Sequence, residues 1–313
     1  MTTDETKEPS EAIVQRSFDR EEKTGTLYLV ATPIGNLEDM TFRAIRTLKE
    51  VGLIAAEDTR QTRKLLTHFE IRNRLVSYHE HNREASGPEL IRLLLDGQSI
   101  ALVSDAGMPA ISDPGAELVR DAVAEGIPVV PIPGANAALA ALVISGLPTD
   151  RFLFAGFPPR DRKSLNKLLD GLEGESGTLI FYESPHRIRK TLAVVAERWG
   201  SRRMAVVREL TKRHEEAIRG TAEACLAHFE SGAPLGECCL LIEGTRSENG
   251  YAEGGREPKT AESWWTGLTV AEHVSHYEAK GRSRKDAMKA AAADRGIGKR
   301  DVYRTLLENE ATP

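Results

Sequence analysis

The chain has 313 residues, of which 40% are hydrophobic and 28% charged, and its net charge is −5. These values are typical of a soluble globular protein and exclude a collagen, a coiled coil and a chain that is disordered throughout. The length favours about two domains and a small third one. The longest apolar run is the eight residues 137–144, whereas a membrane helix needs about 20, so we expect no membrane partner.

The first 24 residues are polar and of mixed charge, and we expect a flexible tail there without a secretory signal. Three cysteines occur, two of them adjacent in sequence, so no disulfide framework is expected. Both features favour a cytoplasmic protein.

Residues 25–147 are expected to form a first α/β domain. Strands are predicted at 26–31, 53–56, 75–78, 99–103 and 127–132, and helices at 41–51, 59–69, 89–95, 115–125 and 136–144. Strands that alternate with helices of about ten residues need crossover connections. The order therefore predicts a mostly parallel sheet covered on both faces.

A second α/β domain is expected at 148–244, after a Gly- and Pro-containing break at 146–149. Strands are predicted at 152–157, 178–182, 204–207 and 238–242, and helices at 163–172, 185–199 and 221–229. Pro185 suits a first helical turn, where no N–H is needed. The fold class is therefore α/β, with two consecutive α/β domains.

Residues 245–262 are expected to be a linker, and 263–313 a small helical module that resembles a helix-turn-helix. Helices are predicted at 270–280, 283–293 and 299–307. Between positions 280 and 304 there are nine Lys or Arg and three Asp, a net +6. Such a surface favours contacts with RNA phosphates, although a solvated charged helix face has the same composition. The candidate contacts are Arg284, Lys285, Lys299 and Arg300.

Several common signatures are absent from the sequence: the phosphate-binding GxxxxGK[ST], a GxGxxG after the first strand, GxSxG, and a CxxC pair for zinc. Instead, loops rich in Gly, Pro and Asx follow three predicted strands, at 31–41, 104–115 and 131–136. Open α/β sheets bind ligands at these strand ends. The three loops together favour a small-molecule site, whereas any one alone would be an ordinary turn.

The sequence resembles the ribosomal RNA small subunit methyltransferase I family, within the tetrapyrrole-methylase-like class III methyltransferases. The matching stretches, in order, are LYLVATPIGNLEDMTFRA, AAEDTR, YHEHN, VSDAGMPAISDPG, PGANAALAAL, FYESPHR and VVRELTKRHEE. The resemblance implies S-adenosylmethionine as the methyl donor, held in a cleft between the two α/β domains. It also implies 2′-O-ribose methylation of a decoding-centre cytidine in 16S ribosomal RNA of the small subunit, and a homodimer.

The resemblance implies that the donor contacts the three loops and one strand end of the second domain. The expected residues are Ala31, Thr32, Pro33, Ser104, Asp105, Ala106, Met108, Ala135, Asn136, Ala137 and Tyr182. Asp105 would add favourable charge near the sulfonium, although a turn or helix cap would also explain it. Pro33 stands where related enzymes carry a glycine, which argues against a tetrapyrrole substrate. The stretch 234–237 has Leu235 where the family often has Lys, which puts a lysine contact there in doubt.

A ribose hydroxyl needs a proton acceptor within hydrogen-bond reach before it attacks a methyl group. The catalytic candidates are Glu183, His186, Glu209 and Lys212. Glu183 or His186 would take the proton and Lys212 would stabilise the developing charge. An ion pair between Glu183 and Lys212, or a helix-capping His186, would explain the same residues without catalysis.

Four further residues are expected at the rim that faces the RNA. Asp58 and Arg60 lie in the AAEDTR stretch, where an Arg fork suits a phosphate. His79 and His81 share one face of an extended segment, but no third ligand is evident, so no metal site is expected. Two other functions remain open: methylation of a tetrapyrrole, and a ribosome-assembly factor that binds RNA without catalysis.

Overall fold

The computed structural model describes residues 14–15, 24–230, 236–245, 265, 267–295 and 297–310. The chain divides into two units, Met1–Glu248 and Asn249–Pro313. Most of the expected tail and linker, together with Pro234, Leu235 and Trp264, lies outside the described residues.

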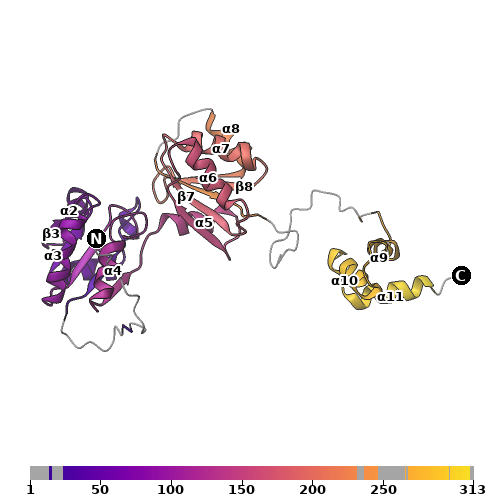
Figure 1. Cartoon of the computed structure of the whole chain (residues 1–313), viewed down its shortest axis with the longest axis horizontal. Helices are drawn as coiled ribbons and strands as arrows, with labels where there is room; N and C mark the ends of the chain where they lie inside the picture. Colours follow the sequence, from indigo (N-terminus) through magenta and orange to yellow (C-terminus); the bar gives the residue numbers. More distant parts are fainter. Residues whose placement is uncertain are drawn as a thin grey trace, which may run out of the picture. The chain divides into compact units, whose positions relative to one another are not determined.

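The first sheet has five strands, all parallel, in the order β3-β2-β4-β1-β5. Figure 1 labels β3 at this sheet together with the surrounding helices α2, α3 and α4. The strands are β1 (Leu27–Val30), β2 (Leu53–Ala56), β3 (Leu75–Ser77), β4 (Ile100–Val103) and β5 (Val129–Ile132). Strands β2 and β4 are buried along their whole length. The parallel sheet predicted for this part of the chain is confirmed.

Helices cover both faces of this sheet. Successive side chains of a strand point to opposite sides, so the apolar strands have side chains to bury on each face. Ile54 and Ala56 pack with α1 (Phe42–Glu50) and α2 (Thr59–His68), whereas Leu53 and Ala55 pack with α3 (Arg83–Leu95) and α4 (Ala116–Ala124). A short 3₁₀ turn, η1 (Leu37–Asp39), precedes α1. Helix α3 begins six residues before the predicted start and contains Pro88 in its interior.

The second sheet is mixed, which the alternating pattern does not indicate. Its strands are β6 (Phe152–Gly156), β7 (Thr178–Glu183), β8 (Arg203–Arg208), β9 (Glu216–Thr221) and β10 (Cys238–Ile242). In the order β6-β7-β10-β8-β9, only β6 and β7 pair in parallel. The sequence pattern misses β9, because its polar residues and Gly220 weaken the strand signal.

The outer face of this sheet is covered by α6 (Arg162–Leu172), α7 (Ile188–Trp199) and α8 (Ala222–Glu230). Helix α7 starts three residues later than predicted, so the prediction of Pro185 as a first-turn residue is wrong. Pro185 instead lies in the turn that follows β7.

Helix α5 (Ala137–Ser145) follows the last strand of the first sheet but packs on the second. Ala138, Ala141 and Leu142 contact the inner face formed by β7, β8 and β10. The side chain of Asn136 caps the helix by accepting a hydrogen bond from the Leu139 N–H at 3.0 Å. The start of α5 is therefore fixed between the loops of one sheet and the surface of the other.

The unit Asn249–Pro313 contains three helices in its described residues: α9 (Val270–Ala279), α10 (Arg284–Arg295) and α11 (Lys299–Glu310). Val274, Ala287 and Val302 lie in its small core. Buried His273 is stacked between the rings of Trp265 and Tyr277.

The polar contacts of His273 fix the orientation of its ring. One nitrogen lies 3.0 Å from Asp294, and the other accepts a hydrogen bond from Arg295. Among the described residues of both units, no helix combines the length and the apolar character that crossing a membrane would require.

Candidate active site

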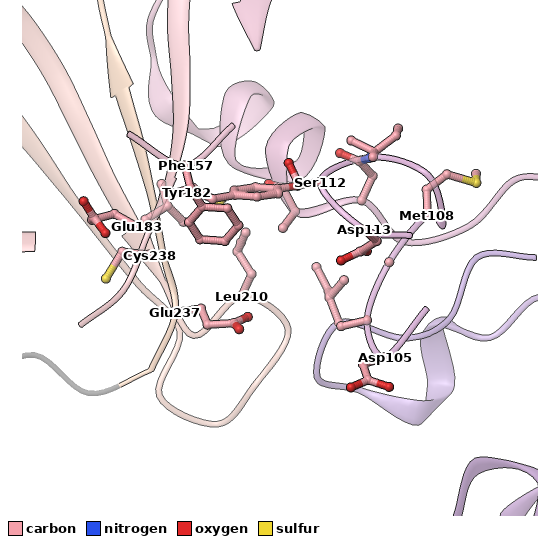
Figure 2. Close-up of a pocket in the computed structure, with 18 of the residues that line it drawn as sticks. Asp105, Met108, Ser112, Asp113, Phe157, Tyr182, Glu183, Leu210, Glu237 and Cys238 are labelled. Carbon is pink, nitrogen blue, oxygen red and sulfur yellow. The ribbon is translucent and has the colours of Figure 1, made fainter. Parts of the chain in front are cut away.

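A cavity of about 280 Å³ lies where the loops of the first sheet face the inner side of the second (Figure 2). One wall is the loop after β4 together with the start of α5, and the other comes from β7, β10 and the loop after β8. The lining residues are Ile34, Glu57, Asp105, Ala106, Gly107, Met108, Ile111, Ser112, Asp113, Asn136, Ala137, Phe157, Tyr182, Glu183, Val207, Glu209, Leu210, Lys212, Glu237, Cys238 and Cys239.

The loop after β4 is held from behind by the loop after β1. Thr32 and Gly107 exchange two backbone hydrogen bonds, at 2.9 and 3.0 Å, and the Thr32 hydroxyl donates to the Ser104 carbonyl at 3.1 Å. Gly107 adopts φ +84°, a conformation that favours glycine. Thr32 and Ser104 are buried and do not line the cavity, so they position the loop that does.

Not all of the predicted donor residues line this cavity. Asp105, Ala106, Met108, Asn136, Ala137 and Tyr182 line it, whereas Ala31, Thr32, Pro33, Ser104 and Ala135 do not. Ala31 is buried, and a Cβ added to Gly134 would lie 2.9 Å from the Ala31 Cβ. The loop after β1 reaches the cavity through Ile34 rather than through Pro33.

Asp105 connects the cavity loop to the loop after β2. Its Oδ1 accepts a hydrogen bond from the Asp58 N–H at 3.1 Å, and Glu57 beside it also lines the cavity. Burial raises the pKa of Asp105, and the neighbouring carboxylate of Asp58 adds to that effect. Burial, followed by the charge of Asp105, likewise raises the pKa of Glu57.

Asp113 is the most strongly perturbed carboxyl group of the cavity. Burial, followed by the charge of Glu57, raises its pKa to about 7, although a hydrogen bond with the Ser104 side chain acts in the opposite direction. Its carboxylate points into the cavity (Figure 2). The sequence reasoning missed this residue, because the motif Ser-Asp-Pro-Gly reads as an ordinary turn before a helix.

An aromatic wall faces these carboxylates. The Tyr182 ring lies 4.9 Å from that of Phe154 and 5.6 Å from that of Phe157, and its hydroxyl accepts a hydrogen bond from the Ala138 N–H at 3.2 Å. Burial raises the pKa of Tyr182 to about 12, so the hydroxyl stays protonated. Tyr182 therefore supports the start of α5 and offers a flat apolar surface.

The Glu183 carboxylate is occupied by contacts within its own domain. It accepts hydrogen bonds from the Ser184 N–H at 2.7 Å and the Thr191 hydroxyl at 2.6 Å, and it lies 3.3 Å from Arg187. In Figure 2 its side chain points away from the loops of the first domain. His186 is exposed and does not line the cavity. The alternative explanation, an ion pair of Glu183 with Lys212, is not what the described residues form, since Glu183 lies beside Arg187 and Lys212 beside Glu209.

Lys212 instead pairs with Glu209, at 2.9 Å between Nζ and Oε1, in the loop after β8. Both residues line the cavity. A Cβ on Gly35 would lie 2.5 Å from the Lys212 Cγ, so the lysine stem crosses the loop after β1 directly above this glycine. The lysine is therefore held close to the cavity mouth.

The stretch 234–237, in which Leu235 departs from the family pattern, has its last residue, Glu237, at this cavity. Glu237, Cys238 and Cys239 line it, and the Cys239 thiol donates to the Ala137 carbonyl at 3.6 Å. Burial raises the pKa of Cys239 to about 12, so its thiol remains neutral. Neither cysteine carried a signal in the sequence beyond its place in an apolar strand.

The four residues expected at the RNA rim do not line the cavity, and Asp58 is connected to it through its contact with Asp105. Arg60 is exposed and forms a two-point ion pair with Asp58, whose pKa falls to about 2 through that hydrogen bond. The rings of His79 and His81 lie 6.0 Å apart. Within the described ranges, no group of three or more His, Cys, Asp or Glu is arranged to hold a metal ion.

The four expected RNA contacts of the C-terminal unit lie on two helices. Arg284 and Lys285 are exposed on the first turn of α10, and Lys299 and Arg300 are exposed at the start of α11. All four residues are therefore exposed to solvent in the described part of this unit.

Solved structures share the two-domain fold. A diphthine synthase aligns with a TM-score of 0.56 at 15% identity, covering 70% of this chain and 90% of its own. A cobalt precorrin-4 methyltransferase aligns with a TM-score of 0.52 at 17% identity, covering 74% and 98%. The sequence model described as Tetrapyrrole (Corrin/Porphyrin) Methylases matches residues 26–225. The fold and the cavity thus define a methyltransferase of the tetrapyrrole-methylase type.

Curated relatives give a narrower assignment. The ribosomal RNA small subunit methyltransferase I of Halalkalibacterium halodurans is 54% identical over 289 residues, which cover 92% of this chain and 97% of the relative. The proteins of that name from Bacillus subtilis and Synechocystis are 53% and 46% identical, with coverage of 92% of this chain and 96% and 99% of their own. The chain belongs to the ribosomal RNA small subunit methyltransferase I family, and the recognised resemblance and the expected enzyme class are confirmed.

Proposed function

We propose that this protein transfers a methyl group from S-adenosylmethionine to the 2′-hydroxyl of a decoding-centre cytidine in 16S ribosomal RNA. The observation that carries this proposal is the cavity that the family's own motifs build between the two sheets. Relatives that match almost the whole chain are named for the small-subunit RNA. This name favours RNA over the tetrapyrrole alternative, and Pro33 in the first loop agrees with it.

The cavity has the composition that a cationic nucleoside ligand needs. Among its described lining residues, six carry carboxyl groups and one is a lysine, which is paired with Glu209. Its volume of about 280 Å³ is near the lower end of small-molecule sites. Tyr182 and Phe157 offer flat apolar surfaces, and Asp105 and Glu57 offer negative charge. The residues therefore fit S-adenosylmethionine, which supplies an electrophilic methyl group on a positively charged sulfur.

The chain's own residues then have to orient the ribose and accept its proton. Well-oriented reactions gain about 7–11 kcal/mol from proximity, and a general base adds about 10²–10⁴-fold. Asp113 suits the role of base, because a carboxylate with a pKa near 7 points into the cavity. The ribose hydroxyl would lose its proton to Asp113 while its oxygen bonds the methyl carbon and the carbon–sulfur bond of the donor breaks, which would leave a neutral thioether. Lys212 would offer positive charge to the oxygen.

The other catalytic candidates have weaker geometric support. Glu183 already accepts two hydrogen bonds and lies beside Arg187, so it is suited to hold the turn after β7. His186 lies outside the cavity lining. Glu209 is paired with Lys212 and suits the role of keeping that lysine in place.

We further propose that the protein acts in the cytoplasm, as a homodimer. The dimer is supported by apolar side chains left exposed on α5 and the edge strand β6. Val143 is 72% exposed, Leu139 48% and Phe152 44%, and burial of such apolar groups against a second copy would favour association. The net +6 segment 280–304 supports a role of the C-terminal unit in RNA binding.

Incubation with labelled donor and small ribosomal subunits that lack the modification tests the proposal. We expect label in a cytidine ribose, released by nuclease digestion as a 2′-O-methylated nucleoside. Label only in a porphyrin-type acceptor would support the tetrapyrrole alternative. Binding of the subunit without any transfer would support a non-enzymatic assembly factor.

A further inference from the structure

Helix α2 presents a stripe of basic side chains that packing of the fold does not require. Its inner face carries the buried residues Thr62, Leu65 and Leu66. Its outer face lines a shallow surface hollow with Arg60, Arg63, Lys64, Thr67 and His68. These positions follow the spacing of one helical face, since residues three and four apart are neighbours. We name these five residues the α2 stripe.

The cations of the α2 stripe are available to a ligand. Arg60 shares its charge with Asp58. Arg63 and Lys64 are exposed, and in the described part of the chain no carboxylate lies within ion-pair distance of either. Within the described residues, the Lys64 Nζ donates to the neutral Gln61 side chain, at 3.1 Å.

The α2 stripe begins beside the proposed active site. Glu57 lines the cavity, and Asp58 caps α2 by accepting a hydrogen bond from the Arg60 N–H at 2.8 Å. The Asp58 N–H in turn donates to Asp105, in the cavity loop. The ten residues of α2 rise about 15 Å along the helix axis. The stripe therefore leads away from the cavity over a distance that exceeds a single phosphate group.

We propose that the α2 stripe binds the sugar-phosphate backbone of the RNA next to the nucleotide being methylated. This inference rests on the proposed function, and it names where the substrate strand runs. Phosphate contacts by Lys and Arg set position and affinity without reading sequence. A row of cations beside an acidic cavity also separates two tasks, because the stripe attracts the polyanion while the cavity attracts the cationic donor.

The test compares two full-length variants with equal loss of charge. The stripe variant carries Arg63→Gln and Lys64→Gln. The control carries Lys163→Gln and Lys167→Gln, two exposed cations on α6 in the other domain. Each is measured for binding to a single-stranded RNA carrying the target sequence, for binding to unmodified small subunits, for donor affinity, and for thermal stability.

We expect the stripe variant to bind both RNA forms about tenfold more weakly at moderate salt. The logarithm of its RNA association constant should fall less steeply with the logarithm of the salt concentration, with a slope smaller in magnitude by about one to two. Donor affinity and thermal stability should match those of the wild type and the control. Ribose methylation by the wild type, measured in parallel, separates failure of this inference from failure of the proposed function.

Two outcomes would overturn the inference. Equal RNA affinity and salt slope for the stripe and control variants would leave the stripe as a solvated helix face. Weakened binding to subunits with unchanged binding to naked RNA would assign the stripe to a ribosomal protein instead.

Discussion

The backbone N–H of Asp58 donates a hydrogen bond to the Asp105 carboxylate, at 3.1 Å. This contact joins the start of α2 to the loop that lines the cavity. It fixes the Asp105 side chain in place while leaving its second oxygen for a ligand. The same residue therefore contributes to the position of the α2 stripe and to the charge of the cavity.

The first prediction concerns the negative charge of Asp105. Asp105→Ala should weaken donor binding about tenfold, because the cavity loses a carboxylate that faces a cation and the loop loses its contact with α2. Asp105→Asn keeps a hydrogen-bond acceptor and should show the loss of charge alone. Calorimetric titration with S-adenosylmethionine measures both, and wild-type affinity in the alanine variant would discard this placement of the donor.

The second prediction is the pH dependence of catalysis. Asp113 accepts a proton only when ionised, and its pKa is raised to about 7 by burial. The pH dependence of kcat/KM reports the pKa values of groups in the free enzyme. The kcat/KM for the donor should therefore rise with pH and level off above about 7. Asp113→Asn should lower kcat by about 10²-fold or more and remove this rise, as seen in initial rates between pH 5.5 and 8.5. A variant that kept the wild-type profile would rule out Asp113 as the base.

The third prediction concerns the stability of the folded chain. Ionisation of Asp113 should favour catalysis but should lower stability. The pKa of Asp113 is higher in the folded chain than its ordinary 3.8, so ionisation is less favourable in the folded state than in the unfolded one. The folded state should therefore lose stability as pH rises from about 4 to about 7. Asp113→Asn stays neutral and should be more stable than the wild type by about 1–2 kcal/mol above pH 7.

Thermal unfolding at pH 5 and pH 8 measures this difference. The advantage of the asparagine variant should be larger at pH 8 than at pH 5. An advantage that is equal at both values would mean that the carboxyl group does not titrate in this range.

The fourth prediction separates the two units of the chain. Removal of residues 262–313 deletes the helices that carry the net +6 segment, whereas the described residues that line the cavity lie within 34–239. The truncated protein should bind RNA more weakly with nearly unchanged donor affinity. Fluorescence anisotropy with labelled RNA and calorimetry with the donor make the comparison. Equal RNA binding by both proteins would give the C-terminal unit a structural role.

Much of the fold is visible in the sequence, because its signals are local. Apolar strands such as Ile100–Val103 and caps such as Asn136 fix where elements begin and end. The pairing of the second sheet is not local. Strand β10 pairs antiparallel with β7 and β8, which lie far from it in the sequence. At the edge of the sheet, β8 pairs with β9 (Glu216–Thr221), whose own sequence has a weak pattern. The sequence reasoning consequently missed β9.

In the candidate site too, the sequence predicts the features with a local signal and misses those that depend on packing between distant segments. Motif reasoning found Asp105 and Tyr182, which both line the cavity. It could not separate the residues that line the cavity from those behind it, such as Thr32 and Ser104, because that depends on how two loops stack. It also missed Asp113, because a raised pKa results from burial and from neighbours such as Glu57, which lies 56 positions away.

A short segment of the chain connects the two sheets beside the cavity. Strand β5 ends the first sheet at Ile132, and α5 is anchored on the second from Ala137 onward. Residues 133–136 therefore form the covalent connection between the first sheet and the helix packed on the second. Asn136 belongs to this connection and lines the cavity, so any shift of one sheet against the other would change the shape of the cavity wall.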